Sequence, residues 1–144
     1  MSERSVLRIA FLGGGTGGHL APGVGVAEIL RRRGHDVCFH VAGRTVERAV
    51  LEPRGLPMVN LFGPGGRPGL GRVGRWFTAT RRWRAAVAEM RPDAVVVLGG
   101  WVSLPAVWSG LNARPSLLIE TNARPGRVQR LLGGRVDVTC LAAP

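Results

Sequence analysis

The sequence predicts an α/β domain with a Rossmann-like, mostly parallel sheet and helices on both faces. Strand-like and helix-like segments alternate along all 144 residues, which is the pattern of a parallel sheet with helical crossovers. The apolar run Val6–Leu12 ends abruptly in the glycine-rich stretch Gly13–Gly18. Ala94–Leu98 is continuously apolar, as expected of a strand buried on both faces. The length suits one domain with a hydrophobic core.

Local signals place each element. A helix is expected at Ala21–Arg33, with Pro22 in its first turn and Gly34 as its C-terminal cap. The loop at Gly63–Gly71 is too rich in glycine and proline for regular structure. The remaining expected elements are strands at Asp36–Ala42, Pro57–Leu61, Ser116–Glu120 and Val136–Leu141, a helix from Thr45 (as its cap) to about Arg54, and helices at Val73–Met90, from the loop Gly99–Pro105 to about Leu111, and near Arg127–Leu132.

Three loops follow strands at the carboxyl edge of this sheet, where such folds bind ligands. They are Gly13–His19, Gly99–Ser103 and Glu120–Gly126, and we expect them to share one cleft. Glycines allow backbone N–H groups to approach a ligand, and a helix N-terminus favours negative charge.

The motifs at these loops leave alternatives open. The spacing of Gly13, Gly15 and Gly18 fits a dinucleotide-binding loop, but Gly43 and Arg44 stand where the ribose-binding acid is expected, an arrangement suited at best to a 2′-phosphate. No Gly-Lys pair follows, which excludes a P-loop. His19 is either a structural helix cap or a general base. Glu120 is a cap, a surface residue or an acceptor for a ligand hydroxyl. His35 and His40 are expected to be structural, with no metal-binding spacing.

Charge and aromatic residues indicate an anionic partner. The net charge is +11 and every basic residue is arginine. No acid lies between Glu52 and Glu89, whereas the same stretch holds Arg67, Arg72, Arg75, Arg81, Arg82 and Arg84. The helix there carries a stripe at helical spacing: Val73, Trp76, Phe77, Thr80, Trp83, Val87 and Met90. We expect its C-terminal half to face the core and the part near Trp76 and Phe77 to contact an anionic membrane. No nucleic-acid-binding module is present, so nucleic acid is not expected as a partner.

Other features bound the class of protein. No apolar run approaches the roughly 20 residues of a membrane span, and the N-terminus does not read as a signal peptide, so a cytoplasmic location is expected. Cys38 and Cys140 both lie in apolar strand-like segments and are expected to be buried thiols rather than a disulfide or metal pair.

Three motifs together resemble the N-terminal domain of the MurG family of N-acetylglucosaminyltransferases. They are GGGTGGHLAPGVGVAEIL at Gly13–Leu30, LGGWVSLPA at Leu98–Ala106 and IETNARPG at Ile119–Gly126. The resemblance implies one half of a two-domain GT-B enzyme that needs no cofactor or metal. That enzyme transfers N-acetylglucosamine from its UDP donor to a polyprenyl-pyrophosphoryl glycan (lipid I to lipid II, in peptidoglycan synthesis) at the inner face of the cell membrane. We therefore prefer a glycosyltransferase to a dehydrogenase that would bind a dinucleotide at the Gly13–Gly18 loop.

The resemblance also implies roles for residues. His19 would be the base, with Glu120 and Asn122 positioning the reacting groups. Donor contacts are implied for Thr16, Gly17 and Gly18, contacts near the acceptor pyrophosphate for Gly99, Gly100, Trp101 and Ser103, and membrane contact for Arg72, Arg75, Trp76 and Phe77. Two of these motifs depart from the family pattern: Trp101 replaces tyrosine, and Ile119-Glu120-Thr121-Asn122 replaces H-E-Q-N.

The resemblance covers nearly the whole chain, so residues 1–144 correspond to the acceptor-binding domain. A donor-binding C-terminal domain is absent from this chain, and either a truncation or a partner polypeptide would explain it. The alternative function is a non-catalytic module that binds membrane or lipid-linked sugar and recruits a catalytic partner, or a related transferase with another acceptor.

Overall fold

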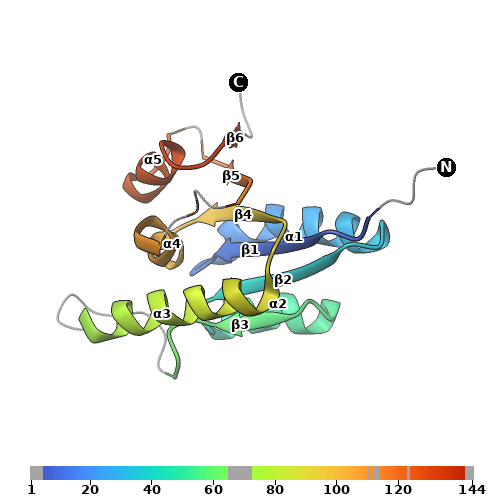
Figure 1. The fold of residues 1–144 in the computed structure, drawn as a ribbon, viewed down its shortest axis with the longest axis horizontal. Helices are drawn as coiled ribbons and strands as arrows, with labels where there is room; N and C mark the ends of the chain where they lie inside the picture. Colours follow the sequence, from blue (N-terminus) through green and yellow to red (C-terminus); the bar gives the residue numbers. More distant parts are fainter. Residues whose placement is uncertain (1–4, 65–72, 110, 112–113, 123, 142–144) are drawn as a thin grey trace.

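The fold is a six-stranded parallel sheet in the order β3-β2-β1-β4-β5-β6 (Figure 1). The computed structural model describes residues 5–64, 73–109, 111, 114–122 and 124–141. All five strand pairs are parallel, which confirms the predicted fold class. The strands are β1 (Arg8–Gly13), β2 (Asp36–Val41), β3 (Met58–Asn60), β4 (Ala94–Gly99), β5 (Ser116–Glu120) and β6 (Val138–Leu141).

Helices connect the strands and cover both faces of the sheet. They are α1 (Gly17–Arg32), α2 (Thr45–Leu51), α3 (Val73–Met90), α4 (Leu104–Ser109) and α5 (Arg127–Gly133), with 3₁₀ turns η1 (Glu52–Arg54) and η2 (Trp101–Ser103). Helical backbone therefore begins inside the predicted loop Gly99–Pro105. The predicted loop Gly63–Gly71 lies largely outside the described residues.

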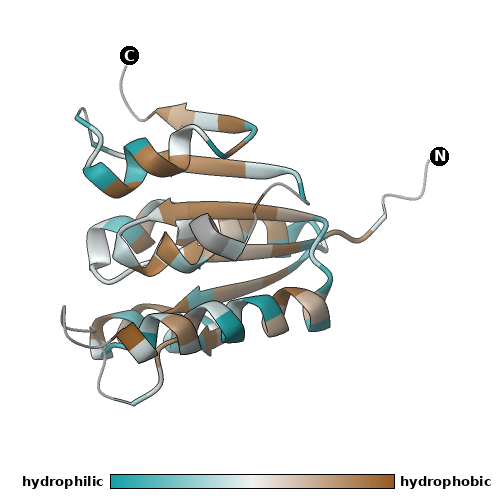
Figure 2. Ribbon diagram, turned by 60° about the vertical axis from the view of Figure 1, so that its left-hand side comes forward, coloured by the Kyte–Doolittle hydropathy of each residue, from teal (hydrophilic) through white to brown (hydrophobic). Residues whose placement is uncertain are grey.

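Two hydrophobic cores form because neighbouring residues of a strand point to opposite faces of the sheet. In β1, Ile9 and Phe11 pack in the core beneath α1 and α2, where Phe11 stacks on Phe39 with ring centroids 4.8 Å apart. The other face, with Ala10 and Leu12, packs in the core beneath α3, α4 and α5. Figure 2 shows the apolar residues running along the strands. Both faces of β1 are therefore buried, which is why its sequence is apolar from Ile9 to Leu12.

The first helix begins earlier than predicted and ends as predicted. It starts at Gly17, so Pro22 lies inside it rather than in its first turn. The C-terminus is a Schellman motif: Gly34, at φ +87°, donates its N–H to the Arg31 carbonyl (2.9 Å), and His35 donates to the Leu30 carbonyl (3.1 Å).

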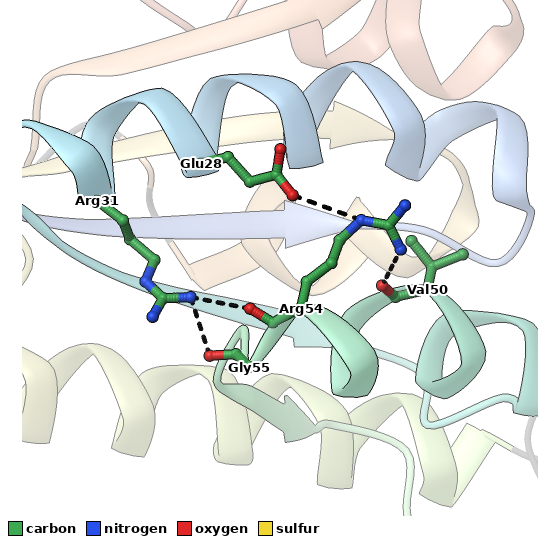
Figure 3. Close-up of polar contacts among 5 residues, drawn as sticks. All are labelled: Glu28, Arg31, Val50, Arg54 and Gly55. Carbon is green, nitrogen blue, oxygen red and sulfur yellow. Dashed lines mark hydrogen bonds and ion pairs between the residues drawn. The ribbon is translucent and has the colours of Figure 1, made fainter.

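A polar cluster ties the far end of α1 to the turn after α2 (Figure 3). Arg31 donates from its guanidinium to the carbonyls of Arg54 (3.1 Å) and Gly55 (3.0 Å). Arg54 donates to the Val50 carbonyl (2.8 Å) and lies 3.5 Å from a carboxylate oxygen of Glu28. Glu28 and Arg54 are partly exposed, so their ion pair contributes about 1 kcal/mol or less. The cluster fixes how α2 docks beside α1.

Two further sequence expectations are wrong. Thr45 is not a helix cap: α2 begins at Thr45, and Glu47 accepts the N–H of the preceding Arg44 from within the helix. Cys140 is not buried, because β6 is an edge strand whose residues are all exposed. Cys38 is partly buried, and burial raises the pKa of its thiol.

Candidate functional site

The loops after β1 and β4 interlock because these strands are neighbours at the point where the strand order reverses. A Cβ on Gly100 would lie 2.6 Å from the carbonyl oxygen of Gly14, and one on Gly13 would lie 2.8 Å from that of Gly99. All four residues have positive φ. A side chain at either contact would force the two loops apart, so glycine is required for their close approach.

The aromatic residue of the second loop lies against the first. A Cβ on Gly15 would come within 2.7 Å of Trp101 Nε1. The Trp101 ring also forms edge contacts with Phe62 and Trp76, with centroids 5.0 and 5.9 Å away, and those two rings are 5.2 Å apart. This aromatic cluster (Phe62, Trp76 and Trp101) joins the second loop to the first turns of α3.

Ser103 hydrogen-bonds to the backbone at the ends of β1 and β4, where the same two loops begin. Its side chain is fully buried, and its hydroxyl lies 2.9 Å from the carbonyl of Gly99 and 3.3 Å from that of Leu12. The serine in this motif therefore fixes the backbone where β1 and β4 end.

His19 lies in the first turn of α1 with both ring nitrogens in polar contact. Nδ1 is 2.7 Å from the Thr16 hydroxyl, and Nε2 is 3.3 Å from the amide nitrogen of Gln129 in α5. With that amide donating to Nε2, the ring proton is on Nδ1 and is donated to Thr16. The lone pair of Nε2 is then the basic site of the ring. Gln129, only 7% exposed, is a site residue that the sequence analysis missed.

The N-terminus of α1 is suited to anionic groups. Thr16 precedes the helix in extended conformation, and its side chain makes no capping hydrogen bond to the helix. The first turn contains Gly17, Gly18 and His19 and no acidic residue. Backbone N–H groups of a first helical turn have no intrahelical partner, and they attract phosphate oxygens.

The buried carboxylate of Glu47 hydrogen-bonds to the backbone of the glycine loop after β1. Glu47 is fully buried; its Oε1 accepts the N–H of Gly15 (2.8 Å) and that of Ala42 (3.4 Å), and its Oε2 accepts the N–H of Arg44 (2.7 Å). The Arg44 guanidinium donates to the carbonyl of Gly15. Arg44 is thus engaged by the protein itself, in the place where a dinucleotide-binding domain would recognise a ribose or a 2′-phosphate.

Glu120 and Asn122 form a pair at the end of β5. Glu120 Oε1 accepts the backbone N–H of Asn122 (2.7 Å) and its side-chain amide (3.0 Å). The carboxyl group is 2% exposed, which excludes a surface role, and its Oε2 is buried without a hydrogen-bond partner among the described residues. An unpaired buried acceptor is costly, so this oxygen is expected to find a hydrogen-bond donor.

The first turns of α3 expose apolar and cationic side chains together. Val73 and Phe77 are 74% and 64% exposed, and the Arg81 guanidinium lies over the Phe77 ring at 5.9 Å from its centroid. Trp76 is partly buried in the aromatic cluster, and Arg75 donates to the carbonyl of Pro64. Arg72 lies outside the described residues. Trp83 is 2% exposed, which confirms that the C-terminal half of the stripe faces the core.

The other two histidines lie away from the loops. His40 is buried in β2, where its Nδ1 is 3.4 Å from the Phe11 carbonyl and its ring meets Trp83 edge-on at 5.1 Å. Burial lowers its pKa from 6.5 to about 4. His35 accepts the N–H of Leu7 through Nδ1 (3.2 Å). Among the described residues, no three His, Cys, Asp or Glu side chains gather as metal ligands would.

The strand order and the two glycine loops at its reversal define a Rossmann-like ligand-binding domain. Its fold matches the crystal structure of MurG from Acinetobacter baumannii with a TM-score of 0.83 and 26% identity, over 96% of this chain and 42% of that one. It also matches the glycosyltransferase SnogD from Streptomyces nogalater (TM-score 0.57, 23% identity), over 79% and 34% of the two chains. The fold is thus that of one domain of GT-B glycosyltransferases.

Residues 9–140 match the glycosyltransferase family 28 N-terminal domain, and the chain belongs to this family. A relative from Verminephrobacter eiseniae is 37% identical over 92% of this chain, and one from Pelobacter propionicus is 34% identical over 91%. Both are named UDP-N-acetylglucosamine–N-acetylmuramyl-(pentapeptide) pyrophosphoryl-undecaprenol N-acetylglucosamine transferase. The chain spans 39% and 37% of their lengths.

Proposed function

We propose that this chain is the acceptor-side half of an inverting transferase that moves N-acetylglucosamine from UDP-N-acetylglucosamine to a lipid-linked muramoyl-peptide. The observation that carries the proposal is the environment of His19: an imidazole between Thr16 and Gln129, next to two interlocked glycine loops. The names of the curated relatives support this donor and acceptor.

The chemistry requires a base at the acceptor hydroxyl. Nε2 of His19 takes the proton from the sugar C4 hydroxyl as that oxygen attacks the anomeric carbon of N-acetylglucosamine. The bond from the anomeric carbon to UDP breaks, and UDP leaves with the electron pair. Because the Gln129 amide donates to Nε2, the ring proton is on Nδ1 beside the Thr16 hydroxyl, and the lone pair is on Nε2. The acceptor hydroxyl would take the place of the Gln129 amide or share Nε2 with it.

Substrate phosphates would be held without a metal. The N-terminal turn of α1 offers N–H groups at Gly17 and Gly18 to the donor, and the loop at Gly99 and Gly100 lies beside it for the acceptor pyrophosphate. Glu120, with its unpaired Oε2, and Asn122 would hydrogen-bond sugar groups from the end of β5. A C-terminal donor-binding domain or subunit would complete the site, because one domain cannot enclose both substrates.

The exposed apolar tip of α3 would place the site at the inner face of the cell membrane. Val73, Phe77 and Arg81 combine apolar side chains with positive charge, as peripheral proteins do at anionic lipid surfaces. The net charge of +11 also favours binding to an anionic lipid surface. In the described part of the chain, no helix is both long enough and apolar enough to cross a membrane.

The test is transfer of labelled N-acetylglucosamine from its UDP donor to lipid I. The chain would be assayed alone and then with the C-terminal half of one of the curated relatives. We expect transfer only when the second half is added, and loss of transfer with retained lipid I binding in His19→Ala. His35→Ala is the matched control, since His35 directly precedes β2 and contacts Leu7 at the amino ends of the strands, away from His19.

Two results would overturn the proposal. Unchanged transfer in His19→Ala would show that His19 is not the base. Binding of lipid I without transfer in any combination would favour a non-catalytic binding module or a different acceptor.

A further inference from the structure

Both polar groups of one glycine are held by a single pair of side chains. The N–H of Gly15 is bound by the Glu47 carboxylate at 2.8 Å, and the carbonyl of Gly15 is bound by the Arg44 guanidinium. Gly14 and Gly15 have φ of +133° and +86°, conformations in which glycine gives up much backbone freedom. The two side chains come from the start of α2, about thirty residues further along the chain.

The Glu47 carboxylate does more than cap its own helix. Its Oε2 accepts the N–H of Arg44, which is the local capping contact, whereas Oε1 faces the glycine loop. A Cβ on Gly14 would lie 2.7 Å from Oε1, so the loop backbone packs directly on the carboxylate. A charged acceptor with no exposed surface makes strong hydrogen bonds, and removing it leaves N–H groups unpaired.

Gly15 is the residue before Thr16, whose hydroxyl contacts Nδ1 of His19. Fixing the peptide on both sides of Gly15 therefore fixes where the Thr16 side chain stands. We propose that Glu47, assisted by Arg44, is a positioning residue that acts through the Gly15 backbone and Thr16 to set the ring orientation of His19. The inference rests on the proposed function only in taking His19 as the base.

The direct test needs no substrate. In the 144-residue chain labelled with ¹⁵N, the shifts of the two His19 ring nitrogens report the hydrogen bond that each nitrogen makes. We expect Glu47→Ala to move the Gly15 amide proton upfield and to move the His19 Nδ1 signal toward that of an imidazole without the Thr16 contact. The matched control is Glu52→Ala, an exposed glutamate a few residues away, which should leave both signals unchanged.

A kinetic test separates positioning from folding. With the C-terminal half of a relative present, Glu47→Ala should lower kcat for transfer about tenfold to a hundredfold, the range that a misplaced catalytic group costs. KM for UDP-N-acetylglucosamine should change by a smaller factor than kcat, because the donor is proposed to bind the N–H groups of Gly17 and Gly18 in α1, whereas the missing contact lies before the helix.

If Glu47→Ala does not fold, Arg44→Ala replaces it, since among the described residues this exposed side chain is hydrogen-bonded only to the Gly15 carbonyl. Wild-type His19 ring signals in a folded Glu47→Ala, or in Arg44→Ala if that variant stands alone, would overturn the inference. If the wild-type assembly shows no transfer, the proposed function fails, and the ring signals still decide whether Glu47 orients His19.

Discussion

The indole of Trp101 lies against the backbone of Gly15, so close that a single added methyl group at Gly15 would meet Nε1 at 2.7 Å. The carboxylate of Glu47 contacts Gly14 and Gly15 as well. The glycine loop is therefore packed between an aromatic ring and a buried carboxylate, and its shape depends on both.

Gly15→Ala should destabilise the chain by about 1–3 kcal/mol, because φ of +86° is strained for alanine and the methyl group collides with the indole. Gly25→Ala is the control: this exposed glycine lies within α1 and has no neighbour within 4 Å of an added Cβ. It should gain about 0.5–1 kcal/mol from helix propensity. Urea unfolding of both variants measures the difference. Equal free energies of unfolding for the two variants would contradict the close contact between Gly15 and Trp101.

Gln129 should influence catalysis through the ring nitrogen that it contacts. The Gln129 amide keeps the ring proton of His19 on Nδ1 by donating to Nε2. In Gln129→Leu this donor is lost, so we expect kcat for transfer to fall about tenfold with little change in folding. Gln129→Glu should be worse, because a carboxylate would accept a proton held on Nε2 and so occupy the basic site. Transfer assays with the C-terminal half of a relative would rank the three side chains, and a Glu variant as active as wild type would contradict the assignment.

Much of the fold could be predicted because both faces of a central parallel strand are buried, which makes Ile9–Leu12 and Ala94–Leu98 continuously apolar. The start of α1 was misplaced for a physical reason. Glycine and proline read as helix breakers, yet the helix begins at Gly17 and continues through Pro22. Burial of Cys140 was wrong because sequence does not tell an edge strand from a central one.

The site could be predicted where its residues lie in a local motif or in a loop whose strand fixes its place. The loops after β1 and β4 were placed together by the rule that carboxyl ends meet at one edge, and the contact of Gly14 with Gly100 confirms it. The predicted shared cleft stays a prediction. Glu47 and Gln129 were missed because their partners are 32 and 110 residues away. A glutamate three residues after a helix cap is a known capping signal, but it does not indicate what its second oxygen binds.

Stability should fall in acid because of His40. Its folded pKa of about 4 lies below the ordinary 6.5, so the unfolded chain binds more protons between these values. The folded form therefore loses stability as the pH falls through this range, by about 2 kcal/mol from about pH 7.5 to about pH 5. His40→Gln should remove most of this slope in urea unfolding, whereas His35→Gln should keep it. A slope that is the same in all three proteins would exclude His40 as its source.

The two adjacent aromatic residues of α3 should respond differently to truncation. Trp76 packs on Phe62 and Trp101, so Trp76→Ala should cost about 2 kcal/mol or more of folding stability. Phe77 is 64% exposed, so Phe77→Ala should change stability by less than about 0.5 kcal/mol. Phe77→Ala should nevertheless lower sedimentation with vesicles that contain anionic lipid, because it removes the most exposed aromatic side chain of the described part of the helix.

Val46→Ala provides the matched control for the vesicle measurement, since it removes an exposed apolar side chain from α2 instead. Neutral vesicles and added salt separate the apolar contribution from the contribution of the arginines, because salt screens only the charges. If Phe77→Ala and Val46→Ala sediment as the wild type does, the tip of α3 does not contact lipid. A loss confined to Trp76→Ala would instead trace binding to the integrity of the aromatic cluster, since the exposed face of the helix would be unchanged in composition.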